Sequence, residues 1–178
     1  MTHWKRQRDE ILFSLLEQFD KQKKPFLIFS NSFVEVNLIT ASLRSKFPDL
    51  TENSIKAIGM NLSITNLKTE LMDYTKFELL ILSSQMALAA FVHGFIKVQD
   101  FSVLCFSDAR GANQNHPFCV IMNNFYTPLR FQELWKPRII GFAELKSLKD
   151  IEADMFSRRE WIMTLKHYTH TFHSVPSA

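Results

Sequence analysis

The stretch FELLILSSQMALAAFVHGFIKVQDFSVLCF, residues 77–106, decides the fold. It opens and closes with short apolar runs, Phe77 to Leu82 and Phe101 to Phe106, in which polar and apolar residues do not alternate regularly. Such runs are typical of strands buried on both faces of a parallel sheet. The segment between them, Gln85 to Val92, has the composition of a buried helix. The stretch therefore predicts a strand, a helix and a second strand.

The same alternation continues outward in both directions. Further strands are predicted at 26–29, 54–58 and 138–142, and helices at 5–21, 34–47, 64–72, 117–125 and 148–172. Short strands separated by helices, without hairpin signals, predict right-handed crossovers. The fold class expected is therefore α/β, a three-layer α/β/α domain with a mainly parallel sheet.

Composition narrows the function classes. The chain has 178 residues and a formal net charge of +3, enough for one domain and without the basic excess of a dedicated nucleic-acid-binding domain. Its four glycines cannot form a Gly-rich phosphate-binding loop. Cys105 and Cys119 are expected to be reduced and buried, and no secretory signal is recognised. We expect an intracellular protein, nuclear or cytoplasmic with the nucleus slightly favoured, and no membrane association.

Four short motifs then occur in order and carry a family resemblance. They are His93-Gly94-Phe95, Asn115-His116-Pro117-Phe118, Ile121-Met122 with Phe125-Tyr126, and Pro137-Arg138-Ile139-Ile140-Gly141. This pattern resembles the first RecA-like domain of Dicer-type helicases, the superfamily 2 branch that includes the RIG-I-like RNA sensors. The resemblance implies a RecA-like domain over residues 1–147, followed by a C-terminal helix, 148–173, and a tail, 174–178.

Departures from the family pattern fall on the ATP motifs. Where the family has D-E-C-H in motif II, this chain has Ser107-Asp108-Ala109-Arg110, and T-A-S-P is replaced by Ala143-Glu144-Leu145-Lys146. The P-loop would fall near residues 1–6, which contain no glycine and follow no strand. A metal-bridged phosphate needs the motif II carboxylate, which a serine hydroxyl does not replace. The resemblance thus implies a non-catalytic pseudo-helicase that lacks its first strand and binds no cofactor.

Two other hypotheses, a hydrolase site and a metal site, are less well supported by the sequence. Asp108, His116 and Ser107 could in principle form a hydrolase site, but loop remnants of motif II explain them more simply, and His116 is expected to fix the start of a helix. His167, His170 and His173 could bind a metal, but their spacing does not keep all three on one helix face. A solvated helix face is the preferred interpretation, so no metal site is predicted.

Two surfaces are candidates for binding. By resemblance to motifs Ia and Ib, RNA contact is expected at Asn31, Ser32, Ser83 and Ser84. The C-terminal helix carries more apolar surface than one contact face needs, which indicates a partner surface or, equally, a well-buried helix. Its candidate partner residues are Trp161, Met163, Tyr168 and Phe172.

The resulting hypothesis is a scaffold or adaptor in small-RNA silencing, with heterochromatin as one setting, which binds protein partners of a silencing complex. The alternatives are a weak RNA-binding module and an ATPase fragment completed by another chain. In RecA-like domains the strand before the P-loop lies inside the sheet. Its absence predicts a gap in the sheet, closed by the flanking strands or by a segment inserted from a partner. The isolated chain is then expected to be marginally stable and prone to aggregate.

Overall fold

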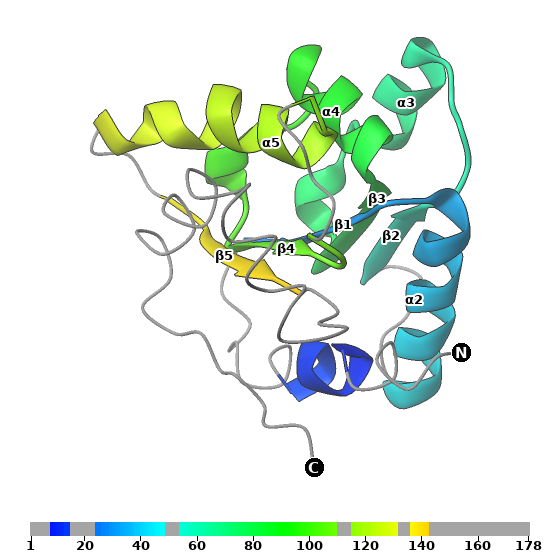
Figure 1. Cartoon of the computed structure of the whole chain (residues 1–178). Helices are drawn as coiled ribbons and strands as arrows, with labels where there is room; N and C mark the ends of the chain where they lie inside the picture. The colour runs from blue at the N-terminus through cyan, green and yellow to red at the C-terminus, as the bar shows by residue number, and fades with distance from the viewer. Residues whose placement is uncertain (1–7, 15–23, 49–53, 110–114, 132–135, 143–178) are drawn as a thin grey trace.

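The computed structural model describes residues 8–14, 24–48, 54–109, 115–131 and 136–142. These residues form an α/β domain of three layers, with a central sheet and helices on both faces (Figure 1). On one face lie α3 (Ile64–Glu70), α4 (Ser84–Val92) and α5 (Pro117–Ile121). On the other lie α2 (Phe33–Lys46) and the helical residues 8–14. The predicted fold class is confirmed.

The sheet contains five strands, all parallel, in the order β2-β3-β1-β4-β5. Their bounds are β1 Phe26–Ser30, β2 Ile55–Ile58, β3 Leu79–Ser83, β4 Val103–Phe106 and β5 Arg138–Gly141. Every residue of β1, β3 and β4 is buried, because helices cover both faces. This burial explains why their sequences are apolar without alternation.

Two apolar cores flank the sheet because successive side chains of a strand point to opposite faces. Leu27 and Phe29 of β1 pack with α4 and α5 in one core, where Phe29 stacks on Phe106 with ring centroids 4.7 Å apart. Phe26 and Ile28 pack with α2 and the helical residues 8–14 in the other core. Cys105 and Cys119 are both buried, as expected, and neither forms a disulfide with a described residue.

Two strands begin later than the apolar runs predict. Phe77 and Phe101 end short 3₁₀ turns, and their N–H groups donate to the carbonyls of Tyr74 and Val98 at 3.2 Å in both cases. An aromatic residue that closes a turn and one that begins a strand look alike in sequence. The predicted helix at 117–125 also changes type, because α5 continues as a π-helix, Met122–Tyr126, and a 3₁₀ helix, Thr127–Phe131.

The described sheet is continuous, which agrees with closure by the flanking strands and not with the other alternative, a strand inserted from a partner. The central strand β1 pairs with β3 on one side and β4 on the other, and β4 also pairs with β5. The backbone groups that a gap would leave unpaired are therefore already bonded across the sheet. The predicted C-terminal helix and tail, including Trp161, Met163, Tyr168 and Phe172, lie outside the described residues. No helix among the residues described is long and apolar enough to cross a membrane.

Candidate functional site

The carboxyl ends of β1 and β4 form the place where an open α/β sheet ordinarily binds a ligand. After β1 the chain turns through α2 toward β2, whereas after β4 it turns through α5 toward β5 on the other side. The two crossover helices lie on opposite faces of the sheet (Figure 1). A crevice at such a topological switch point is the usual ligand position. Its chemistry therefore decides which ligands the domain can take.

Two serines follow the last apolar residues of these strands. Ser30 follows Phe29, Ser107 follows Phe106, and the Ser107 N–H donates to the Phe29 carbonyl at 2.9 Å. Strand alternation directs both side chains to the face covered by α2. Both residues are buried, at 0% and 1% exposed. The two strands thus contribute buried hydroxyl groups to the switch point.

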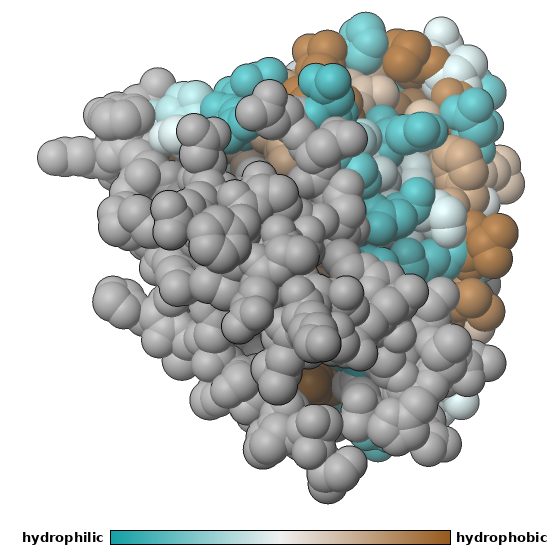
Figure 2. All heavy atoms as spheres, viewed as in Figure 1, coloured by the Kyte–Doolittle hydropathy of each residue, from teal (hydrophilic) through white to brown (hydrophobic). Residues whose placement is uncertain are grey.

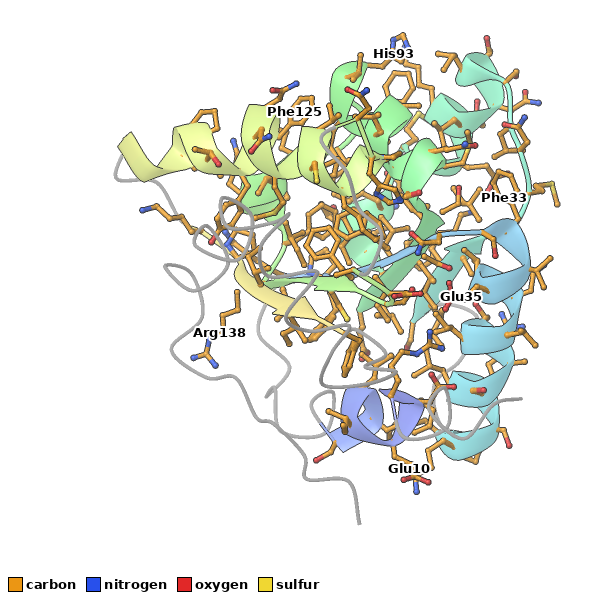
Figure 3. All side chains as sticks on the ribbon, in the orientation of Figure 1. Glu10, Phe33, Glu35, His93, Phe125 and Arg138 are labelled. Atoms are coloured by element: carbon orange, nitrogen blue, oxygen red, sulfur yellow. The ribbon has the colours of Figure 1, made fainter. Side chains whose placement is uncertain are left out.

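Arg8, from the N-terminal helical segment, reaches the switch point. Its Nε and Nη2 donate to Asp9 Oδ1 at 2.9 and 2.8 Å, and its Nη1 donates to a carboxylate oxygen of Glu35 on α2. The same Nη1 lies 3.5 Å from the Ser107 carbonyl oxygen. Only 3% of Arg8 is exposed. We call Arg8, Asp9, Glu35, Ser30 and Ser107 the Arg8 cluster (Figure 3 labels Glu35).

The charged groups of the Arg8 cluster are paired with one another. Burial alone would lower the pKa of Arg8, but hydrogen bonds and charge attraction from Asp9 and then Glu35 outweigh it, so the pKa is raised. The second carboxylate oxygen of Glu35 accepts from the Ser30 hydroxyl at 2.8 Å. A guanidinium held by two carboxylates has little capacity left for a phosphate. In the same way, the two carboxylates are committed to a cation that the chain itself supplies.

The residues at the motif II positions differ from one another in burial and hydrogen bonding. The Ser107 hydroxyl is buried and has no hydrogen-bond partner among the described atoms. Asp108 is half-buried, and its carbonyl accepts from Asn31 Nδ2 at 3.0 Å. Ala109 donates its N–H to the Phe142 carbonyl at 2.7 Å, which joins this loop to the end of β5. Arg110 lies outside the described residues.

His116 fixes the start of α5, as the sequence predicted. Its Nδ1 accepts from the Phe118 N–H at 3.2 Å, and Pro117 occupies the first helical position. Burial lowers the pKa of His116, and the charge of Asp108 partly opposes that effect. The Nδ1 atom of His116 is used by the helix cap, and no hydrogen bond joins His116 to the Ser107 hydroxyl among the described atoms. The hydrolase reading therefore gains no support from the geometry.

The four predicted RNA-contact residues divide into two pairs. Ser83 and Ser84 are buried, and the Ser83 hydroxyl accepts from the Met86 N–H to cap α4. Ser32 caps α2 by accepting from the Glu35 N–H at 3.2 Å, yet it remains exposed beside Asn31. The predicted RNA contact is untested, and the geometry restricts accessible side chains to the second pair.

The buried charges were missed from the sequence. Arg8 and Asp9 lie in a run of mixed charges that looks like a solvated helix face. The burial of Glu35 could have been predicted, because Glu35, Ile39 and Leu43 recur at helical spacing on the buried face of α2. Among the residues described, no group of three or more histidine, cysteine, aspartate or glutamate side chains could hold a metal ion.

Comparison with known proteins gives short but consistent matches. No family model matches the chain. It is 27% identical over 85 residues to Dicer-like protein 2 of Cryphonectria parasitica, covering 44% of this chain and 6% of that protein. It is 37% identical over 73 residues to Dicer-like protein 2 of Phaeosphaeria nodorum, covering 40% and 5%. With Endoribonuclease Dicer homolog 2b of Oryza sativa subsp. japonica it shares 31% over 99 residues, covering 52% and 7%.

One solved structure shares the fold. The helicase domain of Pyrococcus furiosus Hef matches 83% of this chain and 29% of its own length, with a TM-score of 0.58 and 16% sequence identity. At this identity the match shows the fold alone. The chain therefore spans a small part of the curated relatives and under a third of this structural neighbour.

Proposed function

Because this chain is a Dicer-related helicase-like domain with a RecA-like fold, we propose that it acts as a non-catalytic scaffold or adaptor. The observation that carries the proposal is the Arg8 cluster at the switch point. Where a ligand would ordinarily bind, the guanidinium of Arg8 and the carboxylates of Asp9 and Glu35 satisfy one another. A domain whose ligand position is filled by its own ion pairs still keeps the fold. Its outer surface can then serve to bind partner proteins.

ATP hydrolysis has demanding requirements at the same place. The phosphates need several oriented N–H donors or a free cation, and Mg²⁺ needs carboxylate charge. Ser107 supplies a neutral hydroxyl where the family motif has its aspartate. Asp108 is the next residue, and its backbone carbonyl is already bonded to Asn31. These features support a pseudo-helicase rather than an ATPase.

Titration with Mg-ATP tests the proposal directly. We expect no heat of binding at low millimolar nucleotide, and no phosphate release, from the purified full chain. Glu35→Gln removes one carboxylate of the Arg8 cluster and serves as a matched variant. It is also expected to show no heat of binding and no phosphate release. Saturable binding that Asp108→Ala abolishes would refute the scaffold function and favour an ATPase fragment completed by another chain.

The names of the relatives support a proposal for the biological setting. Proteins named Dicer-like protein 2 and Endoribonuclease Dicer homolog 2b suggest small-RNA silencing as the context, with protein components of a silencing complex as partners. A link to heterochromatin is a further setting to examine. Affinity capture of the tagged chain from its native cell, with proteins and RNA identified together, tests this assignment.

Weak RNA binding is the alternative function. Exposed Asn31 and Ser32 at the carboxyl end of β1 support it, since polar groups there could contact a phosphate backbone. If it holds, double-stranded RNA binds at low salt, weakens as salt rises, and loses affinity in the variant Asn31→Ala with Ser32→Ala. The scaffold function expects no binding at physiological salt. Salt-tolerant, sub-micromolar affinity would reverse the order of the two functions.

A further inference from the structure

Helix α2 carries apolar side chains on both of its sides. Val36, Ile39 and Leu43 are buried against the sheet, as a helix of this layer requires. On the outer side, Val34 is 69% exposed and Leu38, one turn later, is 47% exposed. A surface helix usually presents polar residues outward, and one that is apolar on both sides is usually covered. The outer side of α2 is therefore chemically suited to a contact.

The loop after β2 extends this surface. Asn37 Nδ2 on α2 lies 3.5 Å from the Gly59 carbonyl, and a Cβ on Gly59 would lie 2.0 Å from Asn37 Oδ1. The loop thus lies against the Asn37 side chain of α2, and the next residue, Met60, is 63% exposed. Val34, Leu38 and Met60 form what we call the α2 face. Figure 2 shows hydrophobic side chains at the right-hand rim, the side on which α2 lies.

The exposed charges described on α2 are of one sign. Arg44 and Lys46 are exposed in the last turn of α2, and neither forms an ion pair with another described residue. Glu35, the acidic residue of α2, is already paired with Arg8. Glu10, the exposed carboxylate on the neighbouring helical segment (Figure 3), is not paired with either base in the described part of the chain. The outer side of α2 is thus apolar toward its start, and in the last turn one exposed base lies on each flank of that side.

We propose that the α2 face binds an amphipathic helix of a partner protein. Apolar residues of that helix, one turn apart, contact Val34, Leu38 and Met60, and Asp or Glu side chains beyond them meet Arg44 and Lys46. A second copy of the chain is a poorer occupant, because its own α2 brings the same cations and the carboxylate of that helix, Glu35, is already paired with Arg8. The inference rests on the scaffold function and names the class of partner that the scaffold takes.

Two synthetic amphipathic peptides test this inference on the full chain. Both have leucines at helical spacing, and their polar faces carry glutamate in one peptide and lysine in the other. The acidic peptide is expected to bind with an affinity that falls as salt rises, and the basic peptide is not. Leu38→Gln should weaken binding about tenfold or more, since the leucine contact is lost. Arg44→Glu with Lys46→Glu should reverse the preference between the peptides.

Val92→Gln is the matched control. Val92 is 61% exposed on α4, which covers the opposite face of the sheet, so its replacement should leave peptide binding unchanged. Unfolding curves followed by circular dichroism verify that each variant folds. Equal binding of both peptides, or no loss with Leu38→Gln, would overturn the inference. So would a dimer, seen by sedimentation, that Leu38→Gln dissociates, because a second copy would then be the occupant.

Thiol labelling shows whether the face is free. A cysteine placed by Leu38→Cys should react rapidly in the monomer and be protected by the acidic peptide, while Cys105 and Cys119 are buried and react slowly. Slow labelling of the free monomer would overturn the inference, because the chain itself would then cover the face. The outcome is separable from the nucleotide test: failure of peptide binding without ATP binding refutes this partner class alone, and ATP binding refutes the scaffold function.

Discussion

Replacing Arg8 by methionine should destabilise the domain by about 3–5 kcal/mol. Methionine keeps much of the side-chain volume but removes the cation from a cluster in which the Asp9 and Glu35 side chains are 5% and 10% exposed. Breaking a buried ion pair by removing one partner costs that amount, because the remaining charge stays buried without compensation. Two carboxylates lose their partner here, so we place the expected loss toward the upper part of this range.

Companion variants separate charge from packing. Arg8→Lys retains the charge but not the fork that donates to Asp9 and Glu35 together, so it should cost less than Arg8→Met and more than nothing. Glu35→Gln added to Arg8→Met should recover part of the loss, because it removes one uncompensated charge and keeps an acceptor for Ser30.

The assay is urea unfolding followed by circular dichroism, with free energies extrapolated to zero denaturant. An Arg8→Met protein within about 0.5 kcal/mol of the unmodified chain, the range of ordinary surface substitutions, would refute the reasoning. A double variant less stable than Arg8→Met would likewise show that the cost does not arise from unpaired carboxylates.

Two further predictions concern the loop after β4 and the start of α5. Because burial lowers the pKa of His116, the neutral cap contributes fully above its unfolded pKa near 6.5, and the contribution is lost as pH falls through the lower folded pKa. His116→Asn keeps a capping acceptor and should flatten this part of the stability–pH profile, whereas an unchanged profile would contradict the assignment. Ser107→Ala removes a buried hydroxyl without a described partner, so stability should stay constant or rise by up to about 1 kcal/mol; a loss beyond about 1 kcal/mol in urea unfolding would show that the hydroxyl is bonded.

The sequence by itself determined the layers of the domain. Apolar runs such as Phe26 to Phe29 predicted strands buried on both faces, and helical spacing such as Ile39, Leu43 and Phe47 predicted the helices between them, because burial imposes these patterns locally. The capping role of His116 could also be read locally, from a histidine directly before Pro117. The first residues of β3 and β4 were predicted too early, because an aromatic residue can end a 3₁₀ turn as well as begin a strand.

Only the tertiary structure decided the strand order and the site. A short apolar run does not specify its neighbour, and the order β2-β3-β1-β4-β5 depends on crossovers that carry the chain past β1, so the sequence left open whether the sheet closes on itself or takes an inserted strand. The Arg8 cluster depends on contacts between residues 27 and 99 positions apart. Arg8 and Asp9 look like ordinary surface charges in sequence. Their burial follows from the position of two helices against the ends of β1 and β4, which no local pattern contains.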